Sequence, residues 1–183
     1  MLLKPNLSWK ANQGITLPAV QAQVTYVGGA LQVEFIVEEP VDCFRAEIRE
    51  DNSSSWEDSC VEVFLQNPKN PAEYFNFEIT SRGFILAARG SSRQDRQKLP
   101  TEVLAKITRA KQLASIAGNL ICWGMTVTIP PEIFDMNSFE GISLEGNLYK
   151  CADKAKIPHY LSAFPIDTEK PDFHRPEFFQ NLL

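Results

Sequence analysis

The stretch CVEVFLQNPKNPAEYFNFEIT, residues 60–80, contains two short runs in which apolar and polar residues alternate, separated by the turn Asn67 to Pro71. Alternation with a period of two is typical of β-strands, and the prolines and asparagines between the runs favour a turn. Once the runs pair as a hairpin, Glu62 lies on the same face as Asn76 and Glu78. We therefore expect one polar face and one core-facing face.

Similar runs recur along the chain and predict further strands. They cover Gln21–Val27, Leu31–Val37, Phe44–Ile48, Phe84–Ala88, Glu102–Leu113, Leu120–Ile129 and Gly141–Cys151. Gly28-Gly29 supplies the positive φ angles of a tight hairpin between the first two. The run from Glu102 also fits a helix, but its β-branched residues favour a strand. Pro130-Pro131 favours a short helical turn through Phe134.

Many short strands with little helix predict an all-β fold, an antiparallel β-sandwich of the jelly-roll or immunoglobulin-like kind. Nothing in the composition divides the chain, so we expect residues 1–183 to form a single domain. The segment Gly146 to Gln180 is too apolar for a disordered tail and too rich in proline for a helix. We expect it to be an ordered, irregular C-terminal wrap.

Charge and cysteine content limit the classes of function. The net charge is −5, from 18 Lys plus Arg against 23 Asp plus Glu, and no basic stripe occurs, so we expect no nucleic-acid partner. The four cysteines lack paired zinc-site spacing and are expected to be reduced.

No apolar run approaches the ~18 residues needed to span a membrane. The first residues show no export signal, which predicts a cytoplasmic protein unless a signal has been removed.

The polar face of the hairpin suggests how a ligand could bind. Carboxylates and amides hydrogen-bond sugar hydroxyls, and aromatic rings pack on the C–H faces of a pyranose. Trp56 lies in the polar loop DNSSSWEDS and is a candidate stacking platform, with Glu62, Asn76 and Glu78 as polar contacts. The alternatives are an ordinary solvated sheet face and a tryptophan that folds back over the sandwich end.

Catalytic and metal-binding functions have weaker support in the sequence. Glu62 and Glu78 could act as a glycosidase pair, although two acids on one sheet face are common without catalysis. His159 and His174 could form a metal or acid-base pair or contact a ligand, but local hydrogen bonds that hold the wrap explain them better. The acids of the Trp56 loop, Asp51, Glu57 and Asp58, are of the type that calcium prefers, in a spacing that matches no calcium loop.

Three blocks resemble a known family: FRAEIREDN from Phe44, WEDSCVEVFLQ from Trp56, and NLYKCADKAKIPHYLSAFPIDTEKPDFHRPEFF from Asn147. Together with YFNFEITSRG from Tyr74 they resemble the family 9 carbohydrate-binding modules, in particular a stand-alone branch common in Bacteroides-type bacteria. The resemblance covers nearly the whole chain. It implies a β-sandwich that binds sugar between aromatic side chains, with calcium in some members.

The resemblance also implies roles for individual residues. Trp56 stands where members carry an aromatic residue, and Asn76 and Glu78 lie on a strand that lends polar contacts. The C-terminal motif contains four further candidates: Lys150, His159, Asp172 and His174. Relatives carry tryptophan where this chain has Ala163, so an aromatic clamp would be incomplete unless Phe164 substitutes.

The sequence as a whole predicts a non-catalytic domain that recognises an oligosaccharide or polysaccharide and supports polysaccharide breakdown. The alternative is a structural or protein-interaction domain that has lost the sugar site. A less favoured alternative is a glycoside hydrolase that uses Glu62 and Glu78.

Overall fold

A computed structural model describes the backbone of residues 1–183 and every side chain except that of Leu113. Its strands are β1 Leu2–Pro5, β2 Ala19–Val27, β3 Ala30–Pro40, β4 Cys60–Gln66, β5 Tyr74–Thr80, β6 Ile85–Gly90, β7 Gln97–Lys98, β8 Thr108–Ala117, β9 Leu120–Ile129, β10 Glu145–Cys151, β11 Tyr160–Ser162 and β12 Gln180–Asn181. Its helical segments are the short α-helix α1 Thr101–Leu104 and the 3₁₀ turns Lys10–Asn12, Val41–Cys43, Ser55–Glu57, Pro131–Phe134 and Pro176–Phe178. Among the described helices, none is long and apolar enough to cross a membrane.

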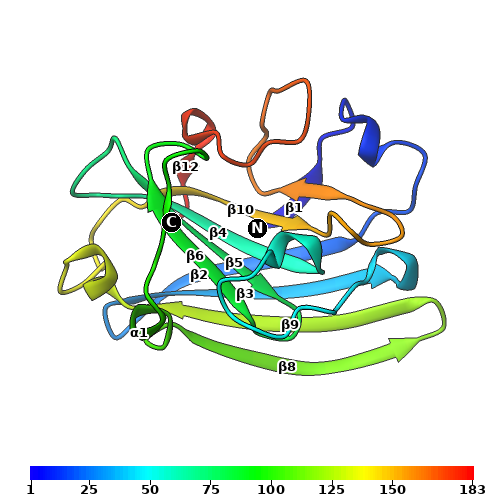
Figure 1. The fold of residues 1–183 in the computed structure, drawn as a ribbon, viewed down its shortest axis with the longest axis horizontal. Helices are drawn as coiled ribbons and strands as arrows, with labels where there is room; N and C mark the ends of the chain where they lie inside the picture. The colour runs from blue at the N-terminus through cyan, green and yellow to red at the C-terminus, as the bar shows by residue number, and fades with distance from the viewer.

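The strands form two antiparallel layers, which confirms the β-sandwich. The first layer has the order β1-β2-β3-β9-β8, and the second has the order β7-β6-β5-β4-β10-β11, with β12 beside β10. Strand β1 pairs with β2 through Leu2 and with β11 through Lys4, so it joins the layers. In Figure 1 the strands β2, β3, β9 and β8 run along one layer, and the orange and red C-terminal segment lies on the side opposite β8.

Alternation along the strands produces two separate apolar clusters. The main core lies between the layers and is built from the inward positions of both, including Phe35, Val63, Phe77 and Val127. A second cluster covers the outer face of β4, β5 and β10, where Trp9, Phe64, Tyr149 and Phe173 pack with other aromatic residues. The C-terminal wrap is therefore ordered because it buries the outer face of one sheet, as its composition predicts.

Several strand predictions are confirmed almost to the residue. Strands β4, β5 and β9 have the predicted bounds. The hairpin between β2 and β3 turns at Gly28 and Gly29, whose φ angles are 57° and 80°. Pro131–Phe134 forms the predicted helical turn.

One predicted strand is absent, and two others start later than predicted. Residues 44–48 form no strand, because the backbone N–H groups of Glu47 and Ile48 donate to the Asp58 carboxylate, each at 2.7 Å, instead of to a neighbouring strand. The run predicted over 102–113 begins with α1, and β8 starts only at Thr108. The last predicted strand starts at Glu145 instead of Gly141.

Candidate functional site

The polar residues of the β4–β5 hairpin share the outer face of the second layer, as predicted. Glu62 lies directly opposite Glu78 in the strand register, and Asn76 donates from Nδ2 to Glu78 Oε1 at 2.9 Å. All three side chains are at most 2% exposed, because the C-terminal wrap covers this face. The open, solvated face considered as an alternative is therefore not present here.

A cavity of about 440 Å³ lies between this sheet face and the wrap. Its lining combines aromatic rings, acids and arginines: Trp56, Glu62, Glu78, Arg93, Arg96, Cys151, Asp153, Tyr160, Pro171, Asp172, Phe173 and His174. Four of the predicted ligand-binding residues, Trp56, Glu62, Glu78 and His174, therefore meet at one place. Asn76 lies beneath them and contacts Glu78.

Trp56 is held at the cavity by its backbone. It lies in the 3₁₀ turn Ser55–Glu57, and its carbonyl oxygen accepts the backbone N–H of Asp153 at 2.9 Å, just beyond the end of β10. The buried Asp58 fixes the same loop through Arg45 and two backbone N–H groups. The Trp56 side chain stays half-buried, with a surface available at the cavity.

Tyr160 and Phe173 supply further aromatic surface. Phe173 stacks on Tyr149 with ring centroids 4.1 Å apart and planes at 5°, and Tyr160 meets Phe173 edge to face at 6.1 Å. Sequence reasoning selected neither residue, because Tyr160 begins the three-residue strand β11 and Phe173 lies in irregular backbone, and periodicity predicts the facing of neither.

Arg96 connects the acids to the wrap. Its Nη1 lies 3.2 Å from Glu78 Oε1 and 3.0 Å from His174 Nε2. Arginine can only donate, so Nε2 is the acceptor and the ring proton is on Nδ1, which donates to the Tyr74 hydroxyl at 2.8 Å. Burial, with the charges of Arg96 and Arg93, lowers the pKa of His174 to about 2. His174 is therefore a neutral part of the cavity wall.

Sequence reasoning also missed Arg93 and Arg96. Both lie in the loop that follows β6, where the Asp95 carboxylate accepts the backbone N–H of Ser92 at 2.7 Å. The run SSRQD is a recognisable side-chain-capped turn. Because β6 pairs with β5, this turn lies beside the Glu78 strand, so the strand order is the signal that would have found the arginines.

The two opposed acids hold protons more strongly than ordinary carboxyls. Burial, followed by the charge of Glu78, raises the pKa of Glu62 well above its usual value. Burial also raises the pKa of Glu78 to about 7, although the nearby Arg96 opposes that rise. Around neutral pH the pair can therefore offer both a hydroxyl donor and carboxylate acceptors to a ligand.

This raised pKa predicts a pH-dependent stability. The folded protein holds the Glu78 proton up to about pH 7, whereas the unfolded chain releases it near 4.5, so this contribution is present below pH 4.5 and is lost as the pH rises through 7. Glu78→Gln cannot lose a proton. We expect the difference in free energy of unfolding, variant minus wild type, to grow by about 3 kcal/mol between roughly pH 4 and pH 8. Urea denaturation at both pH values measures it, and a constant difference would contradict the proposed burial penalty.

Lys150 and His159, also predicted to bind ligand, lie elsewhere. Tyr149 and Cys151 face the wrap, so Lys150 points to the inner side of β10 and is fully buried. Lys150 Nζ donates to His159 Nε2 at 2.7 Å. It also lies 3.1 Å from Glu39 Oε2 and forms an ion pair with it, although the angles do not suit a hydrogen bond. A ligand in the cavity would not reach this buried group, whose place in the fold indicates a structural role.

Ala163 also lies away from the cavity lining. It packs against the main core, as does Phe164, and it borders a separate hollow of about 430 Å³ next to Pro5 and Leu7. The missing tryptophan at this position therefore does not remove a wall of the Trp56 cavity.

The acidic residues considered for calcium are each paired with a different cation. Asp51 binds Arg109 at 2.9 Å, Glu57 binds Lys154 at 2.9 Å, and Asp58 binds Arg45. They do not converge on a common point. Asp172, on the wrap, lines the cavity and accepts the backbone N–H of His174 at 3.1 Å.

Comparison with known proteins agrees with this architecture. A crystal structure from Bacteroides uniformis, named "putative carbohydrate-binding protein", is 32% identical with a TM-score of 0.84, over 97% of this chain and 82% of that one. A family 9 carbohydrate-binding module from Caldicellulosiruptor kristjanssonii in complex with cellotriose has the same fold, with 12% identity and a TM-score of 0.56, over 98% of this chain and 79% of that one. No curated protein matches the sequence. The model of carbohydrate-binding family 9 matches residues 5–183, and the chain therefore belongs to that family.

Proposed function

We propose that this protein is a non-catalytic module that binds an oligosaccharide, or the end of a polysaccharide, in the Trp56 cavity. The observation that carries the proposal is the composition of the cavity, whose lining combines aromatic surface from Trp56 and Tyr160 with two opposed carboxyl groups and two arginines. A pyranose has the complementary surface, with C–H faces for the rings and hydroxyls for the polar groups. The cellotriose complex of the distant family member is consistent with this ligand class.

Two buried atoms strengthen the proposal. Glu78 Oε2 and Asn76 Oδ1 are buried and have no hydrogen-bond partner among the described residues. A buried polar atom without a partner costs about 1 to 3 kcal/mol, and small rearrangements around a bound sugar could supply one. A polysaccharide-degrading system is the setting in which such a module would act, by keeping an associated enzyme close to its substrate.

The proposal is tested by calorimetric titration with oligosaccharides from cellulose and xylan and with host glycans, with and without calcium. Arg96→Ala removes a guanidinium that contacts Glu78 and His174, and we expect it to weaken sugar binding by about 10-fold or more. Arg89→Ala is the matched control, because Arg89 leaves β6 toward a different hollow, next to Phe75.

Two outcomes would reject the proposal. One is the absence of binding across the panel by folded protein, which would favour an interaction domain that has lost its sugar site. The other is equal weakening by Arg96→Ala and Arg89→Ala. Release of reducing sugar that disappears in both Glu62→Gln and Glu78→Gln would instead favour the hydrolase.

A further inference from the structure

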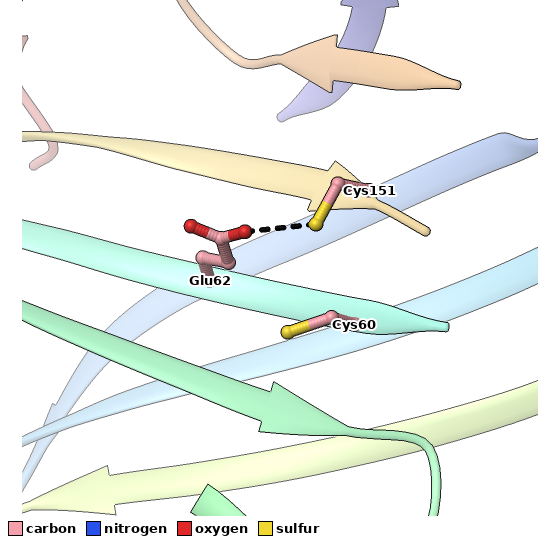
Figure 2. Close-up of side chains that lie close together, drawn as sticks. All are labelled: Cys60, Glu62 and Cys151. Carbon is pink, nitrogen blue, oxygen red and sulfur yellow. Dashed lines mark hydrogen bonds between the residues drawn. The ribbon is translucent and has the colours of Figure 1, made fainter. Parts of the chain in front are cut away.

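Two cysteines and one acid form a compact group at the floor of the cavity. The Sγ atoms of Cys60 and Cys151 and a carboxylate oxygen of Glu62 all lie within 4.8 Å of one another (Figure 2). Cys151 Sγ donates to Glu62 Oε1 at 3.0 Å. All three side chains are at most 2% exposed, and both cysteines are free thiols.

The sheet itself creates this group. Cys60 and Glu62 are two residues apart on β4 and therefore share its outer face, and Cys151 lies directly opposite Cys60 on β10. The ladder of backbone hydrogen bonds fixes these positions, so the group does not depend on a loop. Its two thiols are far apart in the sequence, which explains why cysteine spacing alone does not reveal them.

The donor set and its geometry suit a thiophilic cation. Zinc binds thiolate sulfur at about 2.3 Å and carboxylate oxygen at about 2.0–2.2 Å, which places neighbouring donors of a tetrahedron about 3.5–3.8 Å apart. Donors that already lie within 4.8 Å reach that spacing through small side-chain movements. Calcium and magnesium prefer oxygen ligands and do not suit two thiolates.

We propose that Cys60, Cys151 and Glu62 bind a divalent cation of the zinc class, with the fourth coordination position open to the cavity. Glu62 and Cys151 line the cavity, whereas Cys60 lies beneath it, so the side of the ion that lacks a protein ligand faces the cavity. This is the ligand number of zinc sites that keep one exchangeable position.

Charge and protons balance at such a site. Binding of the ion converts both thiols to thiolates and releases two protons. A third proton is released from Glu62 if that carboxyl group is protonated before the ion binds. Two thiolates, one carboxylate and a divalent cation together carry a charge of −1. Two cations provide the opposite charge: Arg96 on the cavity side and Lys150 on the inner side of β10. Arg96 lowers the pKa of Glu62, and Lys150 lowers the pKa of Cys60. Burial has the opposite effect and keeps the thiols protonated in the absence of the ion.

The test is a titration of the fully reduced wild-type protein with Co²⁺, a spectroscopic substitute for Zn²⁺. We expect one equivalent to bind, with a thiolate-to-cobalt charge-transfer band and the intense visible bands of tetrahedral cobalt, and we expect Zn²⁺ to displace it. Cys60→Ser and Cys151→Ser should each lose most of the charge-transfer band. The matched controls Cys43→Ser and Cys122→Ser should keep it, because both residues lie outside the group.

The wild-type protein alone can overturn the proposal, so a variant that fails to fold does not obscure the result. The proposal is wrong if reduced wild-type protein shows no thiolate-to-cobalt band. It is also wrong if the band survives when both Cys60 and Cys151 are replaced by serine. The site does not depend on sugar binding, and a sugar titration of metal-free protein keeps the two results separate.

Discussion

Trp56→Ala is expected to weaken oligosaccharide binding by at least about 30-fold, equivalent to about 2 kcal/mol. The ring is half-buried and lines the same cavity as Tyr160, so alanine removes a stacking surface that water and the remaining polar groups replace poorly. Isothermal titration calorimetry with the best glycan of the panel measures the change in Kd. The loop should keep its shape, because Asp58 and the Trp56 backbone, not the indole, tie it to the sheet.

Trp56→Phe is the conservative control. It keeps an aromatic face of smaller area, so we expect a loss of only a few-fold, well below that of alanine. An unchanged Kd in folded Trp56→Ala protein would show that the sugar does not stack on this residue.

Lys150→Met is expected to destabilise the fold by about 3–5 kcal/mol. Lys150 and Glu39 are both fully buried, and Glu39 Oε1 also accepts the indole N–H of Trp123 at 2.6 Å. Methionine fills a similar volume but leaves the Glu39 carboxylate buried without its cation. Urea denaturation at neutral pH measures the loss, and the folded fraction should bind sugar with unchanged Kd because Lys150 does not face the cavity.

A double substitution provides the control for Lys150→Met. Adding Glu39→Gln removes the unpaired charge while the new amide oxygen can still accept the Trp123 indole, so much of the lost stability should return. If Lys150→Met instead retained full stability and lost sugar affinity, Lys150 would be a binding residue after all, as the family motif suggested.

The part of the fold that sequence could predict is the part in which side chains alternate. Strands β4 and β5 have one apolar face and one mixed face, and the same rule that places Phe77 in the core places Glu62 and Glu78 together on the other face. Their directly opposite register comes from the strand pairing in the structure. Two glycines with positive φ define the β2–β3 hairpin. Local patterns sufficed because each of these features depends on residues close together in the sequence.

The errors occur where side-chain contacts outside the alternating pattern determine the structure. Residues 44–48 have strand-like composition, yet the Asp58 carboxylate accepts hydrogen bonds from two of their backbone N–H groups, so these groups do not pair with a neighbouring strand. Lys150 and His159 belong to the motif that carries His174, but alternation on β10 and the buried Glu39 place them on the other side of the sheet. Arg96 reaches the site through the pairing of β6 with β5, which a single sequence does not give.

The same reasoning applies to the aromatic walls. The family motif predicted that the alanine at position 163, where relatives carry tryptophan, would leave an aromatic clamp incomplete. In the structure Ala163 borders another hollow. The rings that line the cavity with Trp56 come from Tyr160 and Phe173, which the wrap brings back across the sheet. Their positions depend on packing against Tyr149 and Trp9, in contacts that span long stretches of chain.

The measurement that tests the proposed function most directly is a two-dimensional ¹H–¹⁵N NMR titration. The ¹⁵N-labelled protein is titrated with an oligosaccharide that binds in the calorimetric panel. We expect saturable shifts of the Trp56 indole N–H and of the backbone amides of residues 91–96, 151–153 and 172–174, which surround the cavity. The buried indole N–H groups of Trp9 and Trp123 should shift little. Shifts confined to the outer face of β2, β3, β9 and β8, or to the hollow beside Ala163, with no change at Trp56, would contradict a sugar site in this cavity.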